Sequence, residues 1–219
     1  MRKLSILILT LAAFALPFAC SEKEGNEGVN GPNTPEEPND PDDPGEETIK
    51  YEVGQYYKEG LAEGIVAYVD ESGEHGLLIS LDETRAQWST EYEMLTVMGG
   101  EFSMDDGSSN SAYIRTLENW SDLYPAFVWC HEKNVLGLNA WYLPAIGEFQ
   151  KIMPAVEAIN ATLVEMELAP LATGVNDSYW TSVEVGVSSA YAYSFHEGDI
   201  ASYDLDKLNE HLVRAVRTF

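Results

Sequence analysis

Apolar positions follow two patterns along the C-terminal three quarters of the chain: short runs rich in β-branched and aromatic residues, and longer stretches with a helical period. Residues 64–69 and 76–81 are two short runs separated by a polar turn that contains Gly73. Two such runs around a glycine-bearing turn predict a β-hairpin. The C-terminal end is predicted to form an antiparallel meander of further short runs. These runs are residues 179–182, 190–195, 200–203 and 211–219.

The pattern becomes helical between the hairpin and the meander. Ser109 or Asn110 can cap a first short helix, and Asp122 can begin a second, with Pro125 in its first turn. From residue 146 to residue 167 apolar residues recur every three or four positions, which predicts the longest helical stretch, with an interruption near Pro154. Hairpin, helices and meander in this order predict an α+β domain with helices beside a sheet.

The first 20 residues have the organisation of a lipoprotein signal peptide. A basic start is followed by an apolar run from Leu4 to Phe18 and then by Ala19 and Cys20. The run is shorter than the roughly 20 apolar residues that a membrane-spanning helix needs. We therefore predict a signal peptide over residues 1–19, cleavage before Cys20, and acyl chains on Cys20 that hold the protein on a membrane. The alternative is a plain secretory signal with an incidental cysteine.

Residues 20–48 are predicted to form an acidic, disordered stalk. After Cys20 this segment contains ten acidic residues, one basic residue and no aromatic residue, so it cannot bury enough apolar surface to offset the entropy of ordering. Its five prolines, at positions 32, 35, 38, 41 and 44, are spaced to fall once per turn of a polyproline II helix. The acidic cluster after Cys20 also resembles signals that direct lipoproteins to the outer face of an outer membrane. Whether the domain faces the periplasm or the cell exterior stays open.

Residues 49–219 form the predicted globular domain, and their composition excludes several functions. They contain nine basic and 27 acidic residues, a net charge of −18 that should repel nucleic acid and anionic membrane surfaces. Cys130 is their only cysteine, so no intramolecular disulfide can form within them. Because Cys130 lies on the apolar face of a predicted helix, we interpret it as an inert core thiol.

Four motifs in this order resemble a known domain family. They are Trp141-Tyr-Leu-Pro144 directly before a helix, Tyr179-Trp-Thr-Ser182 followed by Glu184, the strand Ala190-Tyr-Ala-Tyr-Ser-Phe195, and the terminal Val213-Arg-Ala-Val-Arg-Thr-Phe219. The family is found in many bacterial surface lipoproteins and at the C-terminal end of a Legionella collagen-like adhesin. The resemblance implies a C-type-lectin-like fold, antiparallel sheets flanked by two main helical regions, and a display or binding role without a shared enzymatic activity.

The sequence predicts no metal site, no cofactor and no catalytic constellation. The Glu-Pro-Asn and Trp-Asn-Asp triplets of calcium-dependent animal lectins are absent from residues 49–219. Calcium needs six to eight converging oxygens, which scattered aspartates do not establish. The four histidines lie in separate predicted elements without metal-ligand spacing. We interpret one of Arg214 and Arg217 as the partner of an acid beneath the sheet rather than as a ligand-binding residue.

The best candidates for ligand contact lie around the loops that lead into the final meander. Trp88 occurs in a polar segment, residues 84–90, where nothing in the periodicity predicts burial, and exposed aromatic faces stack on sugars and anchor protein interfaces. Trp180 belongs to a family motif, and for it a core position is the favoured interpretation. The candidate ligand-binding residues are Trp88, Asp177, Trp180, Glu184 and His196.

Two hypotheses about function follow from the anchor, the stalk and the resemblance. The first is an outer-membrane surface lipoprotein with a non-catalytic domain that binds a glycan or a protein. The alternative is a structural or accessory subunit of a surface assembly, and an enzyme is the least favoured class.

Overall fold

The first of two β-sheets contains the predicted hairpin. The computed structural model describes residues 50–96, 102–134, 140–196 and 198–219, all in one compact unit of residues 46–219, so the signal peptide, Cys20 and the stalk lie outside the described residues. The sheet is antiparallel, with strand order β1-β2-β3-β9. Its strands are β1 (Tyr56–Glu59), β2 (Ala62–Val69), β3 (Gly76–Ile79) and β9 (Val216–Thr218). The hairpin prediction is confirmed.

The second sheet is mixed, with strand order β4-β8-β5-β6-β7. Its strands are β4 (Thr84–Gln87), β8 (Glu210–Val213), β5 (Tyr179–Glu184), β6 (Ser189–Ser194) and β7 (Asp199–Asp206). All pairs are antiparallel except β5 and β8, which run parallel and pair through Tyr179 and Leu212. The predicted antiparallel meander is confirmed for β5, β6 and β7 only.

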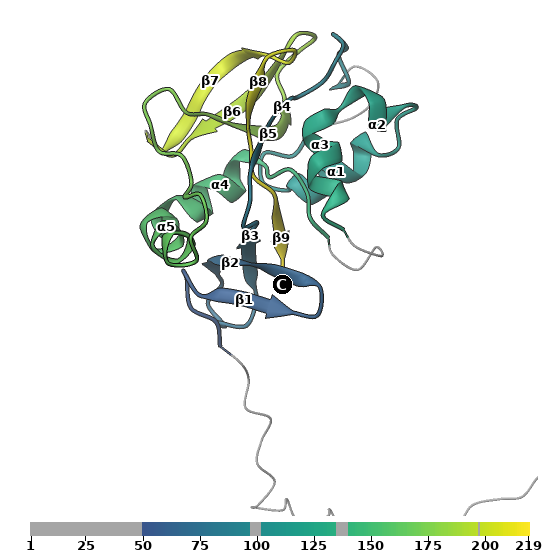
Figure 1. Ribbon diagram of the computed structural model, residues 1–219. Helices are drawn as coiled ribbons and strands as arrows, with labels where there is room; N and C mark the ends of the chain where they lie inside the picture. The colour runs from purple at the N-terminus through teal and green to yellow at the C-terminus, as the bar shows by residue number, and fades with distance from the viewer. Residues whose placement is uncertain (1–49, 97–101, 135–139, 197) are drawn as a thin grey trace, which may run out of the picture. The chain divides into compact units, whose positions relative to one another are not determined.

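The terminal run predicted as one strand is divided between the sheets. It forms β8 in the second sheet and β9 in the first, and Figure 1 shows β9 passing from the upper sheet toward the lower one. Arg214 and Ala215, which lie between the two strands, are both buried. The prediction of a single strand here is wrong because the change of sheet takes place without a turn-forming residue such as glycine or proline.

The helices form two groups that flank the strands on opposite sides in Figure 1. The first group is α1 (Gly107–Ile114), α2 (Trp120–Leu123) and α3 (Pro125–Glu132). The second is α4 (Ile146–Ile152), a 3₁₀ turn (Met153–Ala155) and α5 (Val156–Glu165). Both predicted helical regions are confirmed, as are Pro125 in a first turn and the interruption at Pro154. The prediction that Asp122 begins the second helix is wrong, because Asp122 lies within the short α2 and α3 begins at Pro125. No helix among the described residues is both long and apolar enough to cross a membrane.

The cap of α1 differs from the prediction. The side chain of Asp106, rather than that of Ser109 or Asn110, accepts a hydrogen bond from the Ser109 amide, at 2.9 Å. Asn110 is instead buried, where its side-chain amide donates to Ser103 O and to Ser182 Oγ, both at 2.8 Å. An aspartate at this position also places a negative charge at the positive end of the helix dipole.

Two clusters of buried apolar residues form the core, and each draws on both sheets. The first packs Phe149 and Ile159 of the second helical group against Ile65 of β2 and Tyr193 of β6. The second surrounds Trp88 and includes residues of α1, α3 and β5. The domain is therefore an α+β structure in which two helical groups and two sheets share continuous cores.

Candidate functional site

Trp88 and Trp180 are both fully buried and hold the second core together. Trp88 Nε1 donates to Thr181 O and Trp180 Nε1 donates to Ala86 O, each at 2.9 Å. The Trp88 ring also has edge contacts with Tyr124 and Phe127, with ring centroids 5.9 and 5.1 Å away. The expectation of an exposed Trp88 is wrong, because Trp88 directly follows β4 and its side chain is buried in the second core cluster. The core interpretation of Trp180 is confirmed.

Glu184 is buried and pairs with Lys207. Glu184 Oε1 lies 2.6 Å from Lys207 Nζ, and both side chains have at most 1% of their surface exposed. The two carboxylate oxygens also accept the amides of Leu95 and Thr96, at 3.0 and 2.9 Å. The carboxylate, which offers about four acceptor sites, thus accepts three hydrogen bonds from protein donors. We interpret Glu184 as a structural residue that ties the segment before residue 97 to β5.

Asp177 and His196 each contact the loop that precedes β5, at adjacent residues. Asp177 Oδ2 accepts the Gly174 amide at 3.0 Å, and His196 Nδ1 lies 3.2 Å from Thr173 O. His196 is exposed and Asp177 is half-buried. The five predicted residues therefore separate into a buried group of three and this accessible pair.

His196 is on the edge of an open groove of about 720 Å³ along α5. The residues that line the groove are Met153, Pro154, Val156, Glu157, Asn160, Ala161, Val164, Thr173, Phe195 and His196. Most are apolar, and Val164 is 60% exposed. The Asn160 side chain forms two hydrogen bonds with the backbone of Leu171. Its oxygen accepts the Leu171 amide at 2.7 Å, and its nitrogen donates to the Leu171 carbonyl at 3.2 Å. The groove thus has the size and composition of a binding site, with polar groups at its edge.

A second hollow, of about 420 Å³, has a different chemistry because carboxylates line it. Asp70, Asp105 and Asp106 lie on its wall, together with the buried Glu148. Glu148 Oε2 accepts the amides of Ala145 and Gly107, at 2.7 and 3.1 Å, and Oε1 accepts the Tyr142 hydroxyl at 2.7 Å. Desolvation by burial raises the pKa of Glu148 in spite of these three donors.

Glu148 was not selected from the sequence, although its position gave a signal. A glutamate three residues after the residue that begins a helix commonly reaches back to that residue's amide. Among the described residues, no group of three or more histidine, cysteine, aspartate or glutamate side chains is arranged to hold a metal ion.

Ser178 and His211 form the contact closest to catalytic chemistry. Ser178 Oγ lies 2.7 Å from His211 Nδ1, and burial followed by the charge of Arg85 lowers the pKa of His211. In the described part of the chain no carboxylate bonds to the other ring nitrogen, and neither residue lines any of the hollows described here. The pair thus lacks the third group and the substrate space that nucleophilic catalysis uses.

Cys130 and Arg214 lie where the sequence placed them. Cys130 is fully buried on α3, and desolvation raises the pKa of its thiol far above the ordinary value, so the interpretation as an inert core thiol is confirmed. Arg214 is also fully buried, with Nη1 3.9 Å from Glu83 Oε2. The predicted pairing of a terminal arginine with an acid beneath the sheet is confirmed for Arg214.

The fold and these surfaces define an α+β domain with one open groove and several polar hollows, and solved structures include a similar one. A fimbrial protein from Bacteroides ovatus ATCC 8483 superposes with a TM-score of 0.56 at 16% sequence identity. The similarity covers 76% of this chain and 48% of that protein, so this chain matches about half of its length. No protein-family model matches the chain, and no curated protein matches it. At this identity the similarity shows the fold alone.

Proposed function

We propose that the protein is an accessory or structural subunit of a fimbria-like assembly on the bacterial surface, anchored by lipid on Cys20. The observation that carries this proposal is the fold similarity to a fimbrial protein, which extends over three quarters of the chain. The signal-peptide pattern, the lipidation cysteine and the acidic, proline-rich stalk support it, because together they would present the domain at a distance from a membrane. The finer assignment to a C-type-lectin-like fold remains part of the proposal.

Lipid attachment is tested first, with the two cysteines of the chain as variant and control. Cells that express the chain are fed an alkyne-tagged fatty acid, and the purified full-length protein is examined for the label. We expect Cys20→Ser to abolish labelling and to leave the signal peptide uncleaved, whereas Cys130→Ala should keep the label. Equal labelling of the wild type and Cys20→Ser would exclude the anchor.

Membership in a surface assembly requires a separate experiment. The tagged full chain is isolated with gentle detergent from the bacterium that encodes it, and co-purifying proteins are quantified by mass spectrometry. We expect at least one surface protein in a stoichiometric amount, and loss of the domain when intact cells are treated with protease. Isolation of the chain without stoichiometric partners, or full protection from protease, would contradict the assembly and its outward orientation respectively.

Ligand binding without catalysis is a second candidate function, and the groove along α5 favours it. Val164 lines the groove and is 60% exposed, whereas Val175, which is 68% exposed, does not line it. A lysine at either position leaves the core untouched. If the groove binds a glycan or a protein segment, Val164→Lys should abolish capture on glycan and surface-protein arrays, and Val175→Lys should retain it. An equal effect of both substitutions would remove the groove from consideration.

A further inference from the structure

A third hollow, of about 210 Å³, carries positive charge in an otherwise acidic domain. Its described lining is Ser108, Arg115, His131, Asn134, Ala140, Trp141 and Tyr142. Arg115 follows the last residue of α1, and His131 lies on α3, so the two basic side chains come from neighbouring helices that Figure 1 shows on one side of the molecule. No carboxylate is among these residues, whereas the residues of the whole domain carry a net charge of −18.

Arg115 has no protein counter-ion within the described part of the chain. The ion pairs found there use Lys58, Lys133, Lys207 and Arg214. Arg115 is also exposed, so its guanidinium is accessible to a ligand.

His131 adds a second unsatisfied group beside this guanidinium. Its Nδ1 is buried without a hydrogen-bond partner, and the edge of its ring contacts Trp120, with ring centroids 5.3 Å apart. Burial, and then the positive charge of Arg115, lower the pKa of His131, while Glu132 on the same helix opposes this shift. The positive charge of Arg115 thus disfavours the protonated form of His131.

Hydrogen bonds hold the residues that line the hollow in place, and the hollow itself is small. The Asn134 side chain accepts the Trp141 amide at 2.8 Å and donates to the Trp141 carbonyl at 3.1 Å, which holds the end of α3 against the segment before α4. Sites for complete drug-sized ligands occupy roughly 300–1,000 Å³, so this hollow suits a single ring or a single residue of a larger ligand.

The neighbouring acidic hollow restricts what can enter. Ser108 and Tyr142 line both hollows. The lining of the acidic hollow carries four carboxylates, those of Asp70, Asp105, Asp106 and Glu148, together with the basic side chains of Lys151 and His75. An anionic group is attracted by the guanidinium of Arg115 and repelled by the carboxylates of the neighbouring hollow.

We propose that the hollow at Arg115 and His131 binds the carboxylate group of an acidic ligand. The planar guanidinium of Arg115 pairs with the carboxylate, and Ser108 and His131 supply hydrogen bonds at its side. The carboxylate can belong to an acidic sugar or to the C-terminal residue of a peptide, because both present the same group on a body of one ring or one residue. This site is independent of the proposed role in a surface assembly.

The experiment follows the histidines of the detergent-solubilised full chain by NMR, after labelling the Cε1 carbons of its four histidines with ¹³C. The resonance that disappears in His131→Gln is that of His131. Glucuronate represents the acidic sugar and N-acetylalanine the C-terminal residue of a peptide. Glucose is the neutral control for the sugar, and sulfate shows whether an anion other than a carboxylate binds. The salt concentration is kept constant, because screening changes with it. We expect at least one of the two carboxylates to shift the His131 resonance and to raise the pKa of His131.

Arg115→Gln and Arg85→Gln form a matched pair of variants. Both arginines are exposed and each lowers the pKa of a nearby histidine, His131 and His211 respectively, but only Arg115 lines the hollow. Loss of one charge-assisted contact should weaken carboxylate binding about tenfold in Arg115→Gln, and Arg85→Gln should bind as the wild type does. The proposal is overturned if neither carboxylate shifts His131, if glucose acts as strongly as glucuronate, if only sulfate acts, or if both variants bind equally.

Discussion

At the scale of single residues, the buried cation Lys207 shows how a charge is accommodated in this core. Its ammonium group donates to Glu184 Oε1 at 2.6 Å, to Glu93 O at 2.9 Å and to Val187 O at 3.3 Å. The same nitrogen lies 4.8 Å from the centroid of the Trp88 ring. All three N–H donors are thus satisfied, and the pair holds three separate segments of chain together.

Removal of one member of this pair should be costly. We expect Lys207→Met to lower the free energy of unfolding by about 3 kcal/mol or more, because it leaves the Glu184 carboxylate buried without its counter-ion. Glu184→Gln should have a similar effect, because it leaves the Lys207 ammonium group buried without its counter-ion. The double variant should be more stable than the sum of the single effects predicts, which a double-mutant cycle by urea unfolding measures.

The exposed pair of Lys58 and Glu63 is the control for this prediction. Its charged atoms lie 3.7 Å apart, and the side chains are 60% and 40% exposed. Lys58→Met should cost less than about 1 kcal/mol. A cost for Lys207→Met as small as that for Lys58→Met would show that the buried pair does not stabilise the fold as its geometry indicates.

Glu148 leads to a prediction about pH. Burial raises its pKa above the ordinary value of 4.5 in the folded chain, so the folded state binds more protons than the unfolded state as the pH rises past that value. Its contribution to stability is therefore present below pH 4.5 and decreases as the pH rises through the folded-state pKa. Compared with Glu148→Gln, the wild type should lose stability as the pH rises from about 4 to about 8.

Urea unfolding of both proteins over this range measures the difference. Glu165→Gln, which replaces an exposed carboxylate at the end of α5, is the matched control for the change from glutamate to glutamine. A difference between the wild type and Glu148→Gln that does not change with pH, or that changes in the opposite direction, would contradict the prediction.

At the scale of elements, the sequence predicts best those features that depend on neighbouring residues. The hairpin of β2 and β3, the helix interruption at Pro154 and the position of Pro125 all follow from local periodicity and proline chemistry. β4 lies within the polar segment of residues 84–90, for which the sequence predicts no strand, because Thr84-Arg-Ala-Gln87 has no β-branched residue beyond its threonine. This strand exists because it pairs with β8, more than 120 residues later in the chain.

The candidate site was predicted less well, for the same physical reason. Trp88 is buried and donates a hydrogen bond to Thr181, 93 residues away. No local sequence pattern reveals such a long-range contact. The hollow at Arg115 and His131 depends on the packing of α1 beside α3 and on Trp141, so its residues share no sequence motif. His196, by contrast, is exposed in the structure, and the prediction that placed it among the loops of the final meander uses the general accessibility of loops.

The β2–β3 hairpin depends on a glycine, and this gives a prediction at the same scale. A Cβ atom on Gly76 would lie 1.9 Å from Tyr68 O, next to the irregular pairing between Val66 and Tyr68. A glycine within a strand often marks such a close approach of two backbones. Gly76→Ala should therefore lower the free energy of unfolding by about 2 kcal/mol or more, because the backbone of β2 must move.

Gly60→Ala is the comparison, since Gly60 has a φ of +57° but open space around its Cβ position. Only backbone strain applies there, at about 1 kcal/mol. Urea midpoints of the two variants distinguish a steric clash from backbone strain, and a smaller effect at Gly76 than at Gly60 would refute this account of the hairpin.

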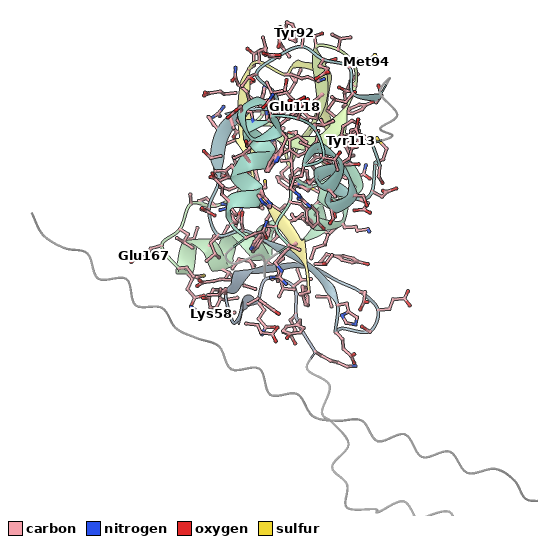
Figure 2. The ribbon with its side chains drawn as sticks, turned by 90° about the vertical axis from the view of Figure 1, so that its right-hand side faces the viewer. Lys58, Tyr92, Met94, Tyr113, Glu118 and Glu167 are labelled. Carbon is pink, nitrogen blue, oxygen red and sulfur yellow. The ribbon has the colours of Figure 1, made fainter. Side chains whose placement is uncertain are left out.

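At the scale of the whole domain, the path of the last strands joins the two sheets into one folding unit. β8 belongs to the second sheet and β9 to the first, with Arg214 buried between them. Both core clusters also include residues of both sheets. Figure 2 places Tyr92 and Lys58 at opposite ends of the domain, and strands of both sheets contribute to each of the two core clusters. Neither sheet can lose its core without exposing that of the other.

The domain should therefore unfold in one cooperative transition, and a cavity in the first cluster should destabilise the second. Leu163, fully buried on α5, belongs to the first cluster, whereas Trp88 and Trp180 belong to the second. Leu163→Ala should cost about 2–5 kcal/mol and shift the urea midpoint of tryptophan fluorescence as much as that of circular dichroism. The adjacent Val164→Ala, on an exposed side chain, should shift neither midpoint appreciably. If Leu163→Ala lowered the dichroism midpoint and left the fluorescence midpoint in place, the two clusters would be separate folding units, and the burial of Arg214 between β8 and β9 would not couple them.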